Sequence, residues 1–283
     1  MAVRASSHTT TTLGKRVDDV LHGFLRERRE DMAAFDEGGA GAVDEIARLI
    51  DAGGKRLRPA MCYWGYRAGG GVDGEPIVRA AAALELLHTM ALVHDDLIDV
   101  AAERRGVETS HVRLARAAGS AAGGRAGALL VGDLAAVLAD QLFLESGFPS
   151  EVLMKALARY HRMRSAMAAG QWLELFGRVP ADQAAVLSRA TLRGGSYTVE
   201  GPLVIGATLA EAPIEIVVAL ERFGEPLGQA FQLRDDLGDG EAAAGITAAD
   251  VDALVGRSLS ALTPLAPEPR EALTVIARQV ASS

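Results

Sequence analysis

The feature that most restricts the fold is the absence of strand-like alternation between apolar and polar residues anywhere along the chain. Apolar residues instead recur at helical spacing, in segments that glycines and prolines separate. A hydrophobic content of 49% with only 5% aromatics also favours helices over sheets. We therefore predict an all-α protein, with one helical domain over residues 17–283 that follows a polar, disordered tail at residues 1–16.

The breaks also predict where the helices lie. Pro202 is expected to kink or restart its helix, and the stretch Gly224–Pro226 to interrupt the next one. The expected helical segments after the first connectors are 76–100, 128–146, 151–176, 182–192, 197–209, 214–236, 247–262 and 269–280.

Charge and composition exclude several classes of protein. The net charge of −8 argues against a nucleic-acid partner, because neutralising phosphates needs a basic surface. A single cysteine, Cys62, fits a reducing compartment, and the N-terminus lacks the apolar core of a secretory signal. We see no apolar run near the roughly 18 residues that span a bilayer, so we expect a cytoplasmic protein without a transmembrane segment.

Two carboxylate clusters of identical spacing stand out. On a helix, the first and last aspartates of each cluster lie one turn apart on the same face. Two such carboxylates repel by roughly 4 kcal/mol at 4 Å with an effective dielectric of 20, so a cation is expected among them. Oxygen ligands suit Mg²⁺ best. The two clusters are Asp95, Asp96 and Asp99, and Asp235, Asp236 and Asp239.

Cations surround the first cluster. The stretch Gly53–Pro59 places three cations, Lys55, Arg56 and Arg58, on a turn that glycines open, where backbone and side chains approach an anion closely. Arg104 and Arg105 follow the first cluster, and His88 precedes it by two helical turns. Carboxylates, Mg²⁺ and a ring of cations together describe a site for a diphosphate.

These residues belong to longer segments that together resemble one protein family. The chain resembles the trans-isoprenyl diphosphate synthase (polyprenyl synthetase) family, and in particular geranylgeranyl diphosphate synthases of the actinobacterial type. The similar segments occur in the family's order and cover roughly two-thirds of the chain. They are GGKRLRP (53–59), ELLHTMALVHDDLIDVAAERRG (85–106), GD (132–133), GQ (170–171) and GQAFQLRDD (228–236).

The resemblance implies a helical bundle around a deep apolar cavity, with isopentenyl diphosphate added head-to-tail to an allylic diphosphate. It implies Mg²⁺, three ions when diphosphate is bound, held by Asp95, Asp99, Asp235 and Asp239, with Asp96 and Asp236 also catalytic. Isopentenyl diphosphate would bind Lys55, Arg58, His88 and Arg105, and the allylic diphosphate would bind Arg104, Arg193 and Gln232. The family also implies a homodimer.

Product length would follow from the cavity floor, which in the family lies just before the first aspartate motif. The matching positions here are Leu87, Met90 and Ala91, none of them aromatic. One helical turn adds about 5.4 Å of depth, comparable with one isoprene unit. We therefore expect a product longer than C15, namely geranylgeranyl diphosphate.

The sequence also departs from the family pattern. Arg193-Gly194 stands where relatives carry lysine followed by serine or threonine, Glu108 replaces a proline, and Gly201 stands where many relatives have arginine. A small-residue linker is expected over residues 240–245, directly after Asp239. The family's lysine-bearing loop is not visible there, as though several dozen residues were missing. Such a loop would close over the diphosphates and exclude water.

Three alternatives remain open at this point. A class I terpene cyclase would use the same fold and first aspartate motif without a site for isopentenyl diphosphate. A non-catalytic subunit would keep the fold and pair with an active relative. A di-iron protein would use Glu85 with His88 and Glu108 with His111, which match the Glu-x-x-His spacing.

Overall fold

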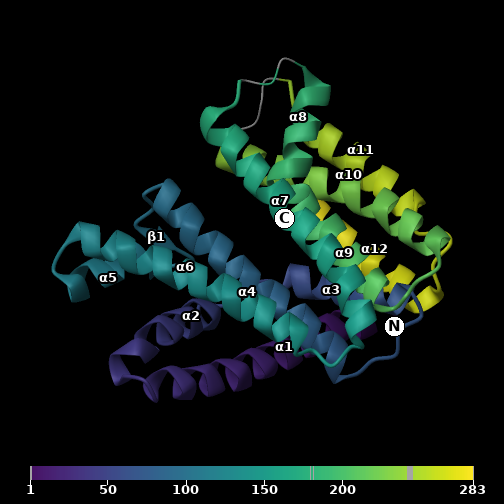
Figure 1. The fold of residues 1–283 in the computed structure, drawn as a ribbon. Coiled ribbons are helices and arrows are strands. Elements are labelled where there is room, and N and C mark those ends of the chain that lie inside the picture. The colour runs from purple at the N-terminus through teal and green to yellow at the C-terminus, as the bar shows by residue number, and fades with distance from the viewer. Residues whose placement is uncertain (1, 179, 181, 241–244, 283) are drawn as a thin grey trace. The chain divides into compact units, whose positions relative to one another are not determined.

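The computed structural model describes residues 2–178, 180, 182–240 and 245–282. Helices dominate it (Figure 1), which confirms the all-α class. The elements are α1 (Ala2–Ala33), η1 (Glu37–Ala40), α2 (Gly41–Asp51), α3 (Leu57–Ala68), α4 (Glu75–Ile98), β1 (Glu103–Arg104), β2 (Val107–Glu108), α5 (Ser110–Ala118), α6 (Ala121–Leu144), α7 (Ser150–Phe176), α8 (Gln183–Ala190), η2 (Thr191–Glu200), α9 (Gly201–Leu209), α10 (Ile214–Asp239), α11 (Ala248–Ser260) and α12 (Pro267–Ser282).

The chain divides into two compact units, each assembled from separate stretches of sequence. The first unit contains the described parts of Met1–Thr12, Ala60–Ile77 and Phe148–Ser283, and the second contains Leu13–Pro59 and Val78–Gly147. The predicted single domain over residues 17–283 and the predicted deep apolar cavity stay predictions.

The second unit is organised around α4. Residues 80–87 of this helix are all buried, as expected of a helix that is apolar on every side. Helices α5 and α6 pack against each other (Figure 1), and α2 packs against α6. The short antiparallel hairpin of β1 and β2 connects the end of α4 to α5 and pairs Arg104 with Val107.

The first unit is organised around α10, which packs against η2, α9, α11 and α12, while α7 packs against η2 and α9. The segment η2 is π-helical over ten residues, a rare conformation that often marks functional sites. Helices α3 and α9 approach so closely that a Cβ on Gly206 would lie 1.9 Å from the carbonyl oxygen of Cys62. Only glycine fits at that crossing.

Several boundaries differ from the sequence prediction. Helix α1 begins at Ala2, within the stretch predicted to be a disordered tail. Helix α6 begins at Ala121, seven residues before the predicted start, because Ser120 caps its first turn by accepting a hydrogen bond from the amide of Gly123. Helix α10 runs through Pro226 without the predicted interruption, packed along its length against η2 and α11. The predicted linker over residues 240–245 lies partly outside the described residues.

Two helices are long and apolar enough to cross a membrane by length and composition, which corrects the expectation that no apolar run approaches this length. The apolar window of α4 is 72% buried inside the protein, and that of α6 is 44% buried. Buried core helices pass the same test, and the burial of the α4 window fits a core helix.

Candidate diphosphate and metal site

The first aspartate motif lies where α4 ends. Asp95 and Asp99 are one turn apart, joined by a backbone hydrogen bond of 2.9 Å from the Asp99 amide to the Asp95 carbonyl. The three side chains differ in exposure: Asp96 is buried, Asp95 is half-buried and Asp99 is exposed. The two outer carboxylates are therefore the ones open to a ligand.

Arg104 reaches back from strand β1 to hold this motif. Its Nε lies 2.5 Å from a carboxylate oxygen of Asp96, and its Nη2 lies 3.1 Å from one of Asp95. Burial raises the pKa of the Asp96 carboxyl above its ordinary value, and the Arg104 guanidinium opposes that shift. Arg104 thus neutralises the charge of Asp96, the one aspartate of the motif that is buried from solvent.

The predicted cations do gather beside this motif. Lys55 is exposed, and the Arg105 guanidinium donates a hydrogen bond to the carbonyl of Gly53 at the start of the same turn. Burial lowers the pKa of His88 well below its usual value, and the charges of the neighbouring arginines lower it further. Those arginines are Arg58, Arg105, Arg104 and Arg56.

The neutral imidazole of His88 lies within a group of guanidinium groups, and this concentration of positive charge favours the binding of an anion. The cations repel one another, and each would be stabilised by a phosphate that accepts hydrogen bonds from several of them. A pocket opens at this place. Its polar lining comes from Arg56, Glu85, Thr89, Asp96, Arg104, Arg105, Glu108 and Thr109.

The second aspartate motif lies at the end of α10, in the other unit. Asp235 and Asp239 are exposed, while Asp236 is half-buried. Gln232 donates to Asp236 over 2.9 Å, and Arg193 Nη1 lies 2.9 Å from the same carboxylate. The motif therefore repeats the pattern of the first, with the middle aspartate held by an arginine and the outer two at the surface.

Arg193 stands at the beginning of η2 and bridges two helices. While Nη1 pairs with Asp236 on α10, Nε lies 2.7 Å from a carboxylate oxygen of Glu174 on α7. A planar guanidinium serves two carboxylates in this way, which the lysine of the family pattern could not do with the same geometry. Arg193, which departs from the family pattern, thus connects three elements of the structure: η2, α7 and α10.

The donor set fits Mg²⁺ bound together with a substrate. Within the described ranges no three His, Cys, Asp or Glu side chains are arranged to hold a metal by themselves. Mg²⁺ usually binds through one or two carboxylates plus substrate phosphates rather than in an all-protein cage. The aspartate pairs at the ends of α4 and α10 offer carboxylates of this kind.

The di-iron alternative is wrong. Glu85 pairs with Arg56 over 2.7 Å, and Glu108 pairs with Arg116, so both glutamates already neutralise arginines. Together with His88 and His111 they form no metal cluster in the part of the chain that the structure describes.

Comparison with known proteins decides the family. A model of the polyprenyl synthetase family matches residues 42–247. The chain belongs to the polyprenyl synthetase family. This family member is 35% identical over 193 residues to a geranylgeranyl diphosphate synthase of Sulfolobus acidocaldarius, covering 67% of this chain and 55% of that protein. It is 31% identical to a geranylgeranyl diphosphate synthase of Methanosarcina mazei, covering 68% of this chain and 56% of that protein.

The polyprenyl synthetase chain therefore spans just over half the length of these relatives. Among solved structures, it resembles a geranylgeranyl pyrophosphate synthase of Corynebacterium glutamicum, complexed with isoprenyl diphosphate and magnesium. The TM-score is 0.87 at 24% identity, with 96% of this chain and 99% of that chain covered. That likeness confirms the fold.

Several contacts of the site escaped the sequence prediction. Arg56 pairs with Glu85 and Asp18 beside the basic cluster, and Glu174 pairs with Arg193. Glu85 stands one turn before His88 on α4, which is a usable signal. Asp18 lies far away in the sequence, and nothing about its position signals the pairing with Arg56.

Proposed function

We propose that this chain is a Mg²⁺-dependent trans-prenyltransferase that condenses isopentenyl diphosphate head-to-tail with an allylic diphosphate. One observation carries the proposal: a single unit combines the carboxylates of Asp95 and Asp99 at the end of α4 with a cluster of arginines around a neutral His88. A terpene cyclase would need the carboxylates but has no use for a second, cation-lined diphosphate site.

In this proposal Lys55, Arg58, His88 and Arg105 hold the diphosphate of isopentenyl diphosphate. Arg104, Arg193 and Gln232 are the proposed ligands of the allylic diphosphate, and the two arginines each also bind a motif aspartate. Asp95, Asp99, Asp235 and Asp239 would hold Mg²⁺, which neutralises the departing diphosphate. Three ions are proposed when that diphosphate is bound.

The reaction then needs positioning and charge more than acid–base groups. The allylic C–O bond breaks and its electron pair leaves with the diphosphate. The double bond of isopentenyl diphosphate attacks the resulting allylic carbon, and the proton lost from the new C–C unit goes to the departing diphosphate. The protein's part is to hold both diphosphates at fixed places, which lowers the entropic barrier of a two-substrate reaction.

We propose geranylgeranyl diphosphate as the product. Leu87, Met90 and Ala91 lie one to two turns before Asp95 on α4, and Leu87 and Met90 are buried. Non-aromatic side chains at these places leave depth for a longer chain, as the relatives named geranylgeranyl diphosphate synthases also suggest.

The test incubates the protein with isopentenyl diphosphate, Mg²⁺ and C5, C10 or C15 allylic diphosphates, and identifies the chain length of the products. We expect elongation that stops at C20 and is abolished by a chelator. Asp95→Asn should reduce turnover at least 100-fold, while Asp19→Asn, an exposed aspartate on α1, should leave it unchanged. No elongation with any partner would reject the synthase, and hydrocarbon from geranylgeranyl diphosphate alone would point to a cyclase.

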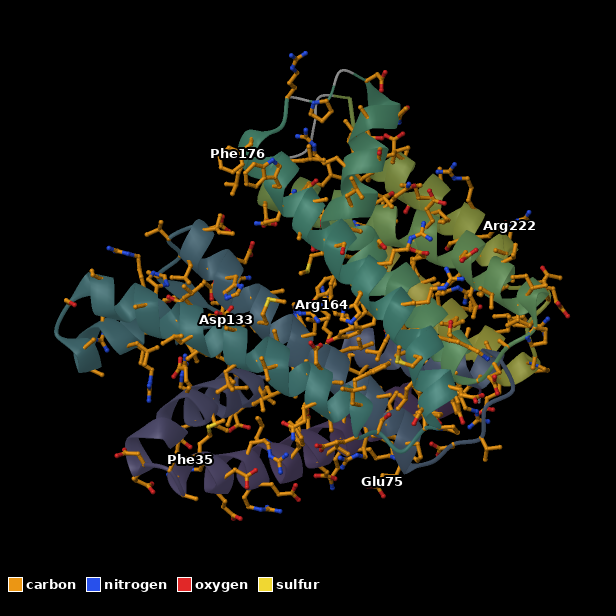
Figure 2. The ribbon with its side chains drawn as sticks, in the orientation of Figure 1. Phe35, Glu75, Asp133, Arg164, Phe176 and Arg222 are labelled. Atoms are coloured by element: carbon orange, nitrogen blue, oxygen red, sulfur yellow. The ribbon has the colours of Figure 1, made fainter. Side chains whose placement is uncertain are left out.

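We also propose a cytoplasmic homodimer, in which α6 pairs with its copy. Leu130, Val137 and Leu144 are more than half exposed and recur every seven residues along this helix, the spacing of a helix–helix seam. Asp133 lies on the same helix (Figure 2), three residues after Leu130 and four before Val137. Sedimentation should give a dimer for the parent protein and a monomer for Val137→Glu; a monomeric parent would refute the pairing.

A further inference from the structure

The strongest unassigned group is a buried arginine within the basic cluster. Arg56 stands between Lys55 and Arg58, the residues proposed to bind isopentenyl diphosphate, yet its own side chain is only 9% exposed. It lines the pocket beside Arg104 and Arg105, but its guanidinium nitrogens are already bonded to groups of the protein. Its role must therefore differ from that of its neighbours.

The contacts of Arg56 connect three helices of one unit. Nε lies 2.7 Å from Asp18 on α1, Nη1 lies 2.7 Å from Glu85 on α4, and Nη2 donates to the carbonyl of Ile50 on α2 over 2.9 Å. Each nitrogen of the guanidinium thus has a different partner. Burial works to lower the pKa of Arg56, but Glu85 and Asp18 more than offset it, so the group stays charged.

The backbone at Arg56 is unusual as well. Its φ of +49° lies in the left-handed region, which disfavours side chains with a Cβ. A residue keeps such a strained backbone conformation only where contacts with the surrounding structure hold it in place. Here the three side-chain contacts of Arg56 hold the backbone in that conformation.

Glu85 places the turn relative to the rest of the cluster. It is buried and stands three residues before His88 on α4, so both side chains lie on the same helix face. Arg105 joins the same turn from the other side, through the carbonyl of Gly53. The ion pair between Arg56 and Glu85 therefore fixes the glycine-opened turn against the helix that carries His88.

We propose that Arg56 is a positioning residue for the isopentenyl diphosphate site: its ion pairs with Glu85 and Asp18 hold the left-handed turn that presents Lys55 and Arg58. This inference rests on the proposed function of the site. It assigns Arg56 no contact with the substrate. Removing Glu85 should consequently weaken substrate binding, although that change removes a negative charge from beside an anion site.

The effect of Glu85→Gln on substrate binding distinguishes a positioning role of Arg56 from a purely electrostatic one. If Arg56 bound the diphosphate directly, or if charge alone mattered, Glu85→Gln would free a cation and tighten binding. If Glu85 and Arg56 act together to shape the turn, Glu85→Gln and Arg56→Gln should both weaken binding, and the double variant should be no worse than the single ones.

The experiment measures the dissociation constant of isopentenyl diphosphate by calorimetry, and the KM for each substrate. We expect Arg56→Gln and Glu85→Gln to raise both constants for isopentenyl diphosphate at least tenfold, with the KM for the allylic diphosphate changed less than twofold. Arg56→Lys should bind isopentenyl diphosphate nearly as weakly, because one ammonium group cannot replace a guanidinium whose three nitrogens each have a different partner. The matched control is Arg29→Gln, an exposed arginine on α1 that pairs with Glu37 and Asp44.

Asp18→Asn provides a milder variant if the others fold poorly, since Asp18 is partly exposed. It should raise the dissociation constant severalfold without a large loss of thermal stability. Tighter binding in Glu85→Gln, full activity in Arg56→Lys, or equal loss of both substrates would overturn the proposal. A parent protein that binds isopentenyl diphosphate but does not elongate would reject the proposed function and leave the binding test valid.

Discussion

Replacing Arg104 by glutamine should expose how the first aspartate motif is stabilised. The side chain of Asp96 is 3% exposed and lies 2.5 Å from Arg104, whose own side chain is 32% exposed. Removing one partner of a fully buried pair costs about 3–5 kcal/mol, because a charge is left buried without compensation. Since solvent reaches part of Arg104, we expect a smaller loss of about 2–3 kcal/mol from the free energy of unfolding.

That loss corresponds to a fall of roughly 3–5 °C in the melting temperature for a chain of this size. Urea unfolding followed by far-UV circular dichroism measures it directly. The matched control is Arg116→Gln, which breaks the exposed pair with Glu108 and should cost under about 1 kcal/mol. Asp96→Asn should cost less than Arg104→Gln, because the remaining guanidinium still reaches water.

The double variant Arg104→Gln/Asp96→Asn should recover at least half of the loss, since no buried charge remains without a partner. The reasoning fails if Arg104→Gln is no worse than Arg116→Gln. It also fails if the double variant is as unstable as the sum of the single ones, which would mean that the two side chains act independently.

Three further predictions concern other parts of the chain. Met90→Phe should shorten the product, which chromatography of dephosphorylated alcohols would reveal; an unchanged product would reject the assigned cavity floor. His88 has a lowered pKa in the folded protein, so the unfolded chain takes up a proton first as the pH falls below 6.5, and stability drops by at most about 1.4 kcal/mol per pH unit. His88→Gln should therefore lose less stability than the parent between pH 7 and pH 5, and parallel stability curves would contradict this. Gly206→Ala should lower the melting temperature sharply because its Cβ would meet the carbonyl of Cys62, whereas Gly256→Ala, with open space around it on α11, should raise it slightly.

The sequence predicted the helical class and the helix that carries the first aspartate motif, because both depend on local patterns. The spacing of Asp95 and Asp99 needs only helix geometry, and the long apolar segment before them predicts α4 within two residues of its observed ends. The cations near His88 follow from their places beside glycines and helix ends.

What sequence could not predict depends on contacts between distant segments. Nothing near Asp18 indicates that it pairs with Arg56 38 positions later, and nothing near Glu174 indicates Arg193. The start of α6 was missed because a glycine-rich stretch disfavours helix locally, whereas packing against α5 and the Ser120 cap stabilise it there. The prediction for residues 241–244 lies outside the described residues.

The two middle aspartates, each paired with an arginine from a different kind of element, set the charge balance of the motifs. Counting only the motif and its arginine, three carboxylates and one guanidinium leave a net charge of −2 at each helix end (−3 + 1 = −2). One divalent ion neutralises each motif. Any further Mg²⁺ has to bring its own counter-charge, so the third ion would enter only as a partner of the substrate's diphosphate. The metal content of the site would then report on substrate occupancy.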